Sequence, residues 1–247
     1  MLRPKNNKTK PRIKHRPFLK WAGGKFRLTD DLNRVFPKRK QCLIEPFVGA
    51  GAVFLNSHFE RYILADINPD LINLFNIVKE NVDAYIEACK PIFFAENANT
   101  ADYYYAQRDA FNQSSDPFER SVLFLYLNRF GFNGLCRYNS KNEFNVPFGA
   151  YKTHYFPEDE LRYFAHKAQS AVFLCADFQQ TFELADKQSV IYCDPPYAPL
   201  PQDTNFTGYA GNSFGLEHQK NLAECAKKAQ KEKHANDDVC PTDIFVS

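Results

Sequence analysis

The sequence predicts a doubly wound α/β fold, in which helices cover both faces of a mostly parallel sheet, with a second unit inserted near its middle. Short β-branched apolar runs alternate with helical patterns in both halves of the chain, as in sheets whose strands are buried on both faces. A loop with two glycines follows the first run, which is typical of strand-to-helix turns that approach a ligand. The alternation stops over residues 91–165 and then resumes, so this stretch is interpreted as an insertion.

Apolar periodicity, with prolines and glycines at the boundaries, assigns the individual elements. The first half is expected to hold a helix over 25–36, a strand over 41–47, a short helix over 52–55, a strand over 62–66 and a long amphipathic helix over 70–89. The insertion is expected to hold helices over 103–111 and 117–130 and a β-hairpin over 131–148. The second half is expected to hold helices over 157–168, 178–185 and 217–233 and strands over 171–175 and 189–193.

Five segments follow from this pattern. They are a basic arm (1–16), one half of the α/β domain (17–90), the insertion (91–165), the other half (166–233) and a divergent tail (234–247). The tail is too short for a further strand–helix–strand unit.

Composition narrows the class of protein. The chain has 247 residues, of which 44% are hydrophobic, and no apolar run near membrane-spanning length. Its start lacks the apolar core of a signal peptide, and seven cysteines without a CxxC pair favour neither disulfides nor a zinc site. We therefore expect a cytoplasmic monomer without a metal or a membrane partner.

Charge is distributed unevenly along the chain. Residues 1–20 hold eight of the 31 basic residues and no acidic one, which leaves 23 basic against 29 acidic residues beyond them. A basic arm ahead of a mildly acidic body is suited to a phosphate backbone. A solvated tail explains residues 1–14 equally well.

The tetrapeptide Asp194-Pro195-Pro196-Tyr197 follows the apolar run 189–193. It would lie just past the carboxyl end of a buried strand, where open α/β sheets place their chemistry. Two prolines remove two backbone donors and leave the neighbouring carbonyls as acceptors. A carboxylate, a bare carbonyl and an aromatic ring on one rigid turn suit a planar group that carries an NH₂. The alternative is an ordinary turn at the end of a strand.

A second set of residues favours a nucleoside ligand. Gly49 and Gly51 stand between a strand and a helix, and Asp66 ends the next strand, where a carboxylate can accept both hydroxyls of a ribose. Each of these features alone is as typical of a structural turn or a helix cap as of a nucleoside site, and only their combination favours the ligand. Gly23-Gly24-Lys25 lacks the spacing of a phosphate-binding P-loop, so Trp21 and Lys25 are interpreted as residues that close over a cofactor. A buried tryptophan beside a helix-start lysine is the competing interpretation.

The predicted hairpin is rich in residues that read nucleic-acid bases. Arginine commonly contacts guanine edges and asparagine adenine edges. Interleaved aromatic residues can stack on bases. The alternative is a polar hairpin with a packed underside. The polar and apolar residues concerned are Arg129, Asn133, Leu135, Arg137, Asn139 and Lys141, and the interleaved aromatic residues are Phe132 and Tyr138.

The chain resembles the Dam-type DNA adenine-N6 methyltransferases, whose recognition insertion lies between the cofactor half and the DPPY motif. The matching segments are FLKWAGGK (18–25), EPFVGAGAVFLN (45–56), ILADIN (63–68), VLFLYLNRFGFNGLCRYN (122–139), EFNVPFG (143–149) and CDPPYAPL (193–200). They occur in the family's order and near its spacings, across roughly residues 17–230.

The resemblance implies a Rossmann-like methyltransferase sheet with an inserted DNA-recognition unit, S-adenosylmethionine as cofactor and GATC-type double-stranded DNA as substrate. The enzyme would be cytoplasmic and associated with the nucleoid through DNA, with a role in DNA methylation that is linked to DNA replication or to a restriction or phage system. The cofactor site would be lined by Trp21, Lys25, Phe47, Gly49, Gly51, Asp66 and Asp194. The DNA site would contain Lys20, Arg129, Asn133, Leu135, Arg137, Asn139 and Tyr151.

The chemistry implied at the DPPY motif is methylation of a flipped-out adenine. Tyr197 would stack on the base, and Asp194 with the Pro195 carbonyl would accept the two N6 hydrogens. The N6 lone pair would then point at the donor methyl group.

Three alternatives stay open on the sequence alone. The related acceptor turn of enzymes that methylate cytosine N4 or a glutamine amide more often has Ser or Asn in place of Asp194. An NAD(P) oxidoreductase would use Gly49 and Asp66 but leaves the DPPY motif unexplained. The strand, Asn-His-Asp motif and terminal hairpin that the family has after residue 233 are not recognisable here. If the sheet follows the family's strand order, the strand over 189–193 is then expected to lack neighbours on one side and to have an unpaired edge. A truncated, catalytically impaired DNA-binding relic is therefore the third alternative.

Overall fold

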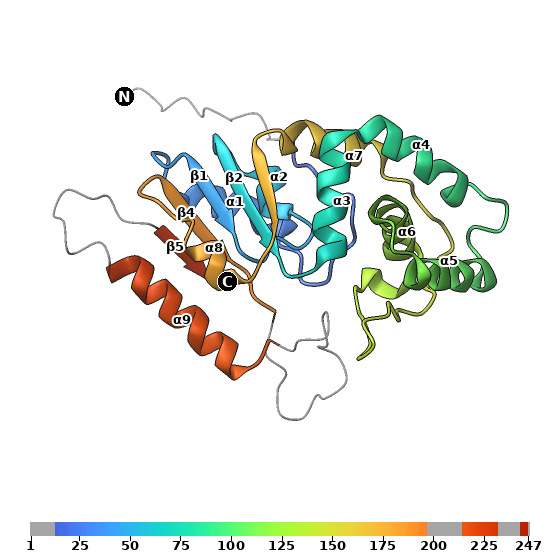
Figure 1. The fold of residues 1–247 in the computed structure, drawn as a ribbon. Helices are drawn as coiled ribbons and strands as arrows, with labels where there is room; N and C mark the ends of the chain where they lie inside the picture. The colour runs from blue at the N-terminus through green and yellow to red at the C-terminus, as the bar shows by residue number, and fades with distance from the viewer. Residues whose placement is uncertain (1–12, 197–213, 232–242, 247) are drawn as a thin grey trace, which may run out of the picture.

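A five-stranded parallel sheet forms the centre of the computed structural model, which describes residues 13–196, 214–231 and 243–246 (Figure 1). The strand order is β3-β2-β1-β4-β5, and every neighbouring pair is parallel. The chain winds outward from β1 to β3 on one side and from β4 to β5 on the other, which confirms the predicted doubly wound fold. The strands are β1 (Cys42–Glu45), β2 (Arg61–Asp66), β3 (Ala171–Cys175), β4 (Ser189–Cys193) and β5 (Asp243–Val246).

Side chains that alternate along the strands build a core on each face of the sheet. Leu43, Tyr62 and Val190 pack on one face with α2 (Ala52–Asn56), α3 (Pro69–Glu80) and α7 (Glu158–Ala168). Ile44 and Ile191 pack on the other with α8 (Phe178–Phe182) and α9 (Leu216–Lys231). β1 and β4, which lie side by side in the middle of the sheet, are buried along their whole length, which explains their continuous apolar sequence. A 3₁₀ turn, η1 (Phe26–Leu28), leads into α1 (Thr29–Val35), where the sequence predicts one helix.

The helix predicted over residues 70–89 is two helices. Asn81 leaves the helical conformation, with φ −152° and ψ 82°, and its side chain accepts a hydrogen bond from the backbone N–H of Ala84 at 3.1 Å. α3 therefore ends at Glu80, and α4 (Val82–Phe93) begins with Asn81 as its N-cap. The cap satisfies a backbone donor that a continuous helix would have bonded internally, which is why the single-helix prediction is wrong.

The insertion packs on α3 through a core that is continuous with one face of the sheet. α5 (Ala101–Gln113) and α6 (Pro117–Phe130) lie side by side, and α6 is buried on nearly every face (Figure 1). The segment over 131–148, which contains the 3₁₀ turn η2 (Phe132–Gly134), pairs through two isolated antiparallel bridges, Gly131–Phe148 and Tyr138–Phe144, in place of the continuous strands of the predicted hairpin.

The prediction that β4 has an unpaired edge is wrong. β5 pairs with it in parallel, with Val190 opposite Asp243 and Cys193 opposite Val246. α9 is the crossover helix between β4 and β5. A strand of only four residues after this helix is therefore enough to complete a further strand–helix–strand unit. One strand beyond β4 is thus present where the sequence predicted a divergent tail.

No helix among the described residues is long and apolar enough to cross a membrane.

Candidate active site

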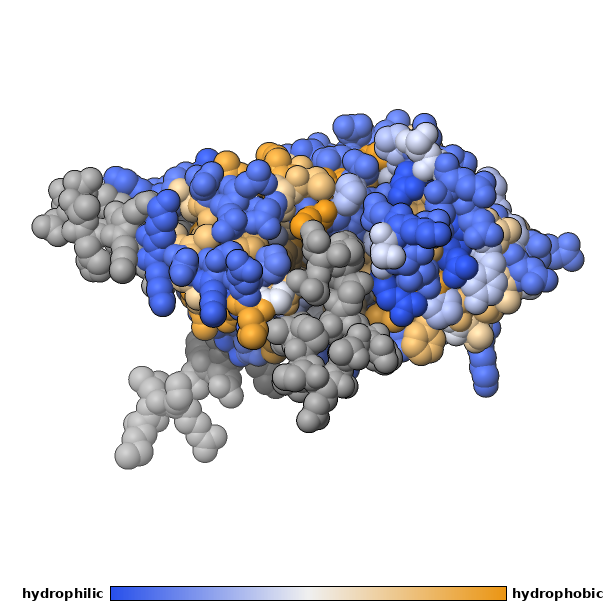
Figure 2. Space-filling model, turned by 60° about the horizontal axis from the view of Figure 1, so that its bottom comes forward, coloured by the Kyte–Doolittle hydropathy of each residue, from blue (hydrophilic) through white to orange (hydrophobic). Residues whose placement is uncertain are grey.

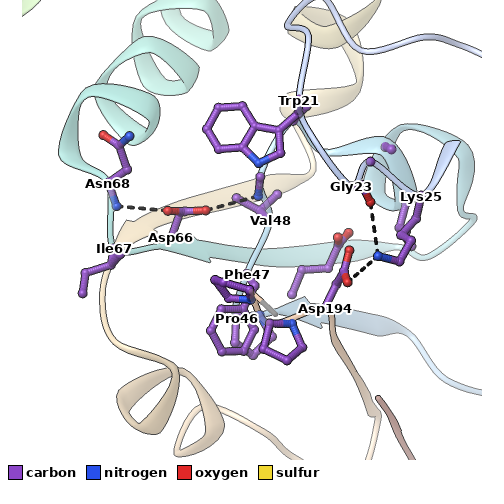
Figure 3. A pocket seen from close by; sticks show the side chains of 18 of the residues that line it. Trp21, Gly23, Lys25, Pro46, Phe47, Val48, Asp66, Ile67, Asn68 and Asp194 are labelled. Carbon is purple, nitrogen blue, oxygen red and sulfur yellow. Dashed lines mark hydrogen bonds and ion pairs between the residues drawn. The ribbon is translucent and has the colours of Figure 1, made fainter. Parts of the chain in front are cut away.

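A cavity of about 540 Å³ opens at the carboxyl ends of β1, β2 and β4 (Figure 3). This is where the winding of the sheet reverses, and a crevice at this switch point is the usual ligand site of open α/β sheets. Segments far apart in the sequence meet there, because parallel strands deliver their following loops to the same edge. The lining comes chiefly from residues 21–26, 45–50, 52–53, 66–68, 176–178 and 194–196.

An ion pair occupies one end of the cavity. Lys25 Nζ lies 2.6 Å from Asp194 Oδ1 and 3.2 Å from the Gly23 carbonyl oxygen. The two side chains are only 11% and 21% exposed, so water screens the pair weakly. Pro195 and Pro196 also line the cavity and offer it no N–H donor. Tyr197, the fourth residue of the motif, lies outside the described residues.

Asp66 faces the cavity at the end of β2. Its two oxygens accept the backbone N–H groups of Gly49, at 3.2 Å, and Asn68, at 3.0 Å (Figure 3). Burial nevertheless raises its pKa above the ordinary value. Each carboxylate oxygen keeps a further lone pair for a ligand hydroxyl.

Gly49 brings the backbone close to the ligand space. Its φ is +48°, and a Cβ placed there would lie 2.9 Å from Trp21 Nε1. A side chain at this position would displace the indole, so glycine allows Trp21 to pack over the turn. Gly51, with φ +75°, is the N-cap of α2 and does not itself line the cavity, unlike the other residues predicted for the cofactor site.

Aromatic rings line the cavity beside Pro46 and Phe47. The rings of Phe47 and Phe178 stack with centroids 5.7 Å apart, and Phe214 meets Phe47 edge-on at 5.6 Å. Sequence reasoning identified Phe47 but missed Phe178 and Phe214. Phe178 follows the carboxyl end of β3, a position that could have signalled a role, whereas Phe214 lies in no recognisable motif.

Glu45, the last residue of β1, is a buried acid that sequence reasoning did not assign to the site. Its side chain lines the cavity, the residue is 2% exposed, and Oε1 has no hydrogen-bond partner among the described residues. Burial, and next the negative charge of Asp194, raise its pKa to about 8, against a hydrogen bond from Phe54 and the charge of Lys167. Its neighbourhood therefore favours a neutral carboxyl group beside the Lys25–Asp194 pair.

Four of the residues predicted to contact DNA gather between the N-terminal segment and the insertion. Lys20 Nζ donates to the Arg129 carbonyl at 2.7 Å and lies 3.8 Å from the centroid of the Tyr151 ring. Tyr151 Oη donates to the Gly131 carbonyl and accepts the Asn133 N–H at 2.8 Å. Burial and the nearby Arg129 charge lower the pKa of Lys20 to about 8. The structure thus joins Lys20, Arg129, Asn133 and Tyr151 in one polar cluster.

The remaining predicted DNA contacts lie along the hairpin. Arg137 donates to the side-chain and main-chain oxygens of Asn145, at 2.7 and 3.1 Å. Asn139 holds the turn by accepting the N–H groups of Lys141 and Glu143, and Leu135 is half-buried. In the view of Figure 2, the insertion at right presents a largely hydrophilic surface.

The sequence profile of the D12 class N6 adenine-specific DNA methyltransferases matches residues 21–243. The chain belongs to this family. The match spans the glycine loop, the insertion and the DPPY motif, so the cavity described above lies within the methyltransferase domain.

Curated relatives agree with this assignment. A DNA adenine methylase of Haemophilus influenzae is 82% identical over 233 residues, which cover 94% of this chain and 82% of the relative. DNA adenine methylases of Escherichia coli K12 (60% identical, 87% of this chain, 76% of the relative) and Vibrio cholerae El Tor (59%, 89% and 79%) are also similar.

The protein is accordingly an adenine-specific DNA methyltransferase. This assignment resolves the alternatives of cytosine, glutamine and NAD(P) chemistry in favour of adenine N6 in DNA. Among the described residues, no three His, Cys, Asp or Glu side chains are grouped so that they could hold a metal ion.

Proposed function

We propose that this methyltransferase uses S-adenosylmethionine to methylate N6 of an adenine that is flipped out of duplex DNA at GATC. One observation carries the proposal. The cavity brings together a ribose-type acceptor, an aromatic wall and the Asp194 carboxylate at the switch point of the sheet.

The residues of the cavity fit the cofactor. Asp66 has lone pairs for the two ribose hydroxyls, and Phe47 with Phe178 offers ring faces for the adenine of the cofactor. The glycine turn, which has no room for a Cβ beside Trp21, lets the backbone approach closely. Trp21 and Lys25 would hold the amino-acid end. The bound cofactor supplies an electrophilic methyl group on a sulfonium, and the protein positions it.

Asp194 would act on the target amine. With the Pro195 carbonyl, it would accept the two N6 hydrogens, which draws the lone pair out of conjugation with the ring and aims it at the methyl group. Lys25 would fix the carboxylate for this task, since its Nζ is bonded to both Asp194 and the Gly23 carbonyl. An adenine in a duplex cannot reach the cavity unless it is flipped out, and Tyr197 would stack on the extruded base.

The insertion would read the sequence of the site. Arg129, Arg137 and Lys20 supply cationic donors, Asn133 and Asn139 supply amides, and Leu135 and Tyr151 supply apolar and aromatic contacts. GATC is proposed from the family resemblance of these segments.

Methyl transfer from labelled S-adenosylmethionine to paired duplexes tests this proposal. The duplexes differ in one base pair of a single GATC, and a third carries GATC that is already N6-methylated on both strands. We expect about 10–100-fold faster incorporation into unmodified GATC than into the altered site, because one mismatched pair costs about 1–3 kcal/mol. The premethylated duplex should accept none. Equal incorporation into the first two duplexes would overturn the proposed specificity.

A further inference from the structure

One turn serves both the cofactor cavity and the insertion. It runs from Asp66 at the end of β2 to Asp70 in the first turn of α3. Asp66 accepts the backbone N–H of Asn68 at 3.0 Å, and the Asn68 side chain caps α3 by accepting the N–H groups of Asp70 and Leu71. A ligand held by Asp66 therefore rests on a turn whose shape Asn68 fixes.

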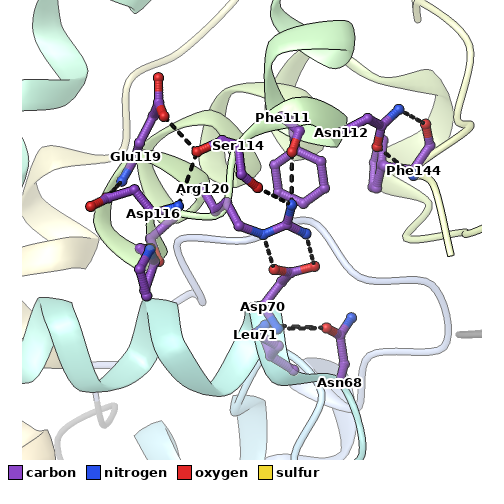
Figure 4. A network of polar contacts seen from close by, with 12 residues as sticks. Asn68, Asp70, Leu71, Phe111, Asn112, Ser114, Asp116, Glu119, Arg120 and Phe144 are labelled. Atoms are coloured by element: carbon purple, nitrogen blue, oxygen red, sulfur yellow. Dashed lines mark hydrogen bonds and ion pairs between the residues drawn. The ribbon is translucent and has the colours of Figure 1, made fainter.

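Asp70 connects this turn to the insertion through three donors. Arg120 donates to its two carboxylate oxygens through Nε at 2.8 Å and Nη2 at 2.9 Å (Figure 4). Tyr138 Oη donates to Oδ2 at 2.6 Å. Asp70 is buried, so these charge-assisted bonds are shielded from water. Burial raises the pKa of Tyr138 well above its ordinary value, which keeps its hydroxyl a donor.

Arg120 extends the connection to the helices of the insertion. Its Nη1 donates to the carbonyls of Phe111, at 2.7 Å, and Ser114, at 3.0 Å, where α5 ends (Figure 4). The guanidinium also lies 4.1 Å from the centroid of the Phe111 ring. The Asp70 carboxylate is thus connected through Arg120 to the loop between α5 and α6, and through Tyr138 to the hairpin.

The hairpin meets the same turn at a second point. Asn68 Nδ2 donates to Cys136 Sγ at 3.2 Å, and Cys136 lines the cofactor cavity. Cys136 and Tyr138 are the two neighbours of Arg137, a proposed DNA contact. The backbone on both sides of Arg137 is therefore attached to the turn beneath Asp66.

We propose that Tyr138 is a positioning residue that couples cofactor binding to DNA binding. The inference rests on the proposed function. A cofactor bound to Asp66 restricts the conformations of the turn between β2 and α3. The Tyr138–Asp70 and Cys136–Asn68 hydrogen bonds then restrict the conformations of the segment that contains Arg137. Coupling of this kind is reciprocal, so DNA must raise cofactor affinity by the same factor.

Duplex affinity measured with and without saturating S-adenosylhomocysteine, which cannot donate a methyl group, tests this coupling. In the unaltered protein we expect the cofactor product to tighten GATC duplex binding about 10-fold, within the usual range of couplings. Tyr138→Phe, which loses only the hydroxyl, should reduce that factor to below about 2-fold. Its affinity for S-adenosylhomocysteine without DNA should stay unchanged.

Tyr126→Phe is the matched control. Tyr126 is also buried in the insertion, but its hydroxyl donates to the Ala98 carbonyl at 2.7 Å, away from the β2–α3 turn. This variant should keep the full coupling. Cys136→Ala removes the hydrogen bond between Asn68 and Cys136, and it should lower the coupling as Tyr138→Phe does. It tests the same inference independently if Tyr138→Phe folds poorly.

Three results would overturn the inference: full coupling in both Tyr138→Phe and Cys136→Ala, equal loss of coupling in Tyr126→Phe, or no coupling in the unaltered protein when it binds both ligands. Failure of the unaltered protein to bind S-adenosylhomocysteine at all would instead overturn the proposed cofactor, so the two failures are distinguishable.

Discussion

Asp194→Asn is expected to lower kcat for methyl transfer about 10²–10³-fold, the usual cost of removing one preorganised electrostatic partner from an active site. The amide keeps the shape of the side chain but loses the charge that bonds to Lys25 Nζ at 2.6 Å. It also replaces an acceptor oxygen with a donor NH₂, which repels the N6 hydrogens instead of accepting them. The KM for duplex DNA should change far less, because the recognition residues are untouched. Single-turnover transfer at saturating DNA and cofactor measures the effect.

Asp186→Asn is the control for this substitution. Asp186 lies just before the other end of β4, where it accepts the Gln188 N–H and pairs with Arg61, and it is remote from the cavity lining. It makes the same chemical change near the same strand and should leave kcat within about 2-fold, as expected of an exposed ion pair. Unchanged transfer by Asp194→Asn would contradict the role given to this carboxylate.

Glu45→Gln is expected to remove a pH dependence of stability on the order of 3–5 kcal/mol. The pKa of Glu45 is about 8 in the folded protein, above the ordinary 4.5. Below pH 4.5 the carboxyl group is protonated in both states, and its contribution to stability is fully present. Between these values the unfolded chain releases the proton and the folded chain keeps it, so the free energy of unfolding falls as pH rises and levels off above pH 8. Glutamine carries no such proton.

Urea unfolding of both proteins from pH 5 to pH 8.5 measures this difference. The free energy of unfolding of Glu45→Gln should rise relative to that of the unaltered chain across this window, while other titrating groups cancel. A flat difference for Glu45→Gln would mean that this carboxyl group ionises normally despite its burial.

The sequence was sufficient to predict the parts of the fold that depend on local pattern. β4 and α6 begin and end at the predicted residues, since a continuous β-branched run and a proline-initiated helix leave little choice of register. The glycine turn and Asp66 also lie together as expected, because parallel strands bring their carboxyl ends to one edge.

The features that the sequence did not reveal depend on tertiary contacts. The amphipathic pattern of the sequence continues through Asn81 without interruption, so it gives no sign that one helix ends there and another begins. β5 has three strand-favouring residues, Ile244, Phe245 and Val246, but a four-residue segment is too short to be recognised as a strand without its pairing to β4. Phe214 reaches the cavity from a segment without a ligand-binding pattern, and Cys136 reaches it from a segment whose pattern predicts DNA contacts, so only the folded chain places them at the cavity.

The central claim, that the cavity at the switch point binds S-adenosylmethionine, is tested most directly by fluorescence titration. Trp21 is the single tryptophan of the chain and lines the cavity, so its emission reports on this site alone. Adding S-adenosylmethionine should change Trp21 emission saturably at one equivalent, and Asp66→Ala should weaken the midpoint at least about 10-fold, as loss of hydrogen bonds to a charged acceptor implies. Equal affinity in Asp66→Ala, or no change in emission while calorimetry records binding, would contradict it.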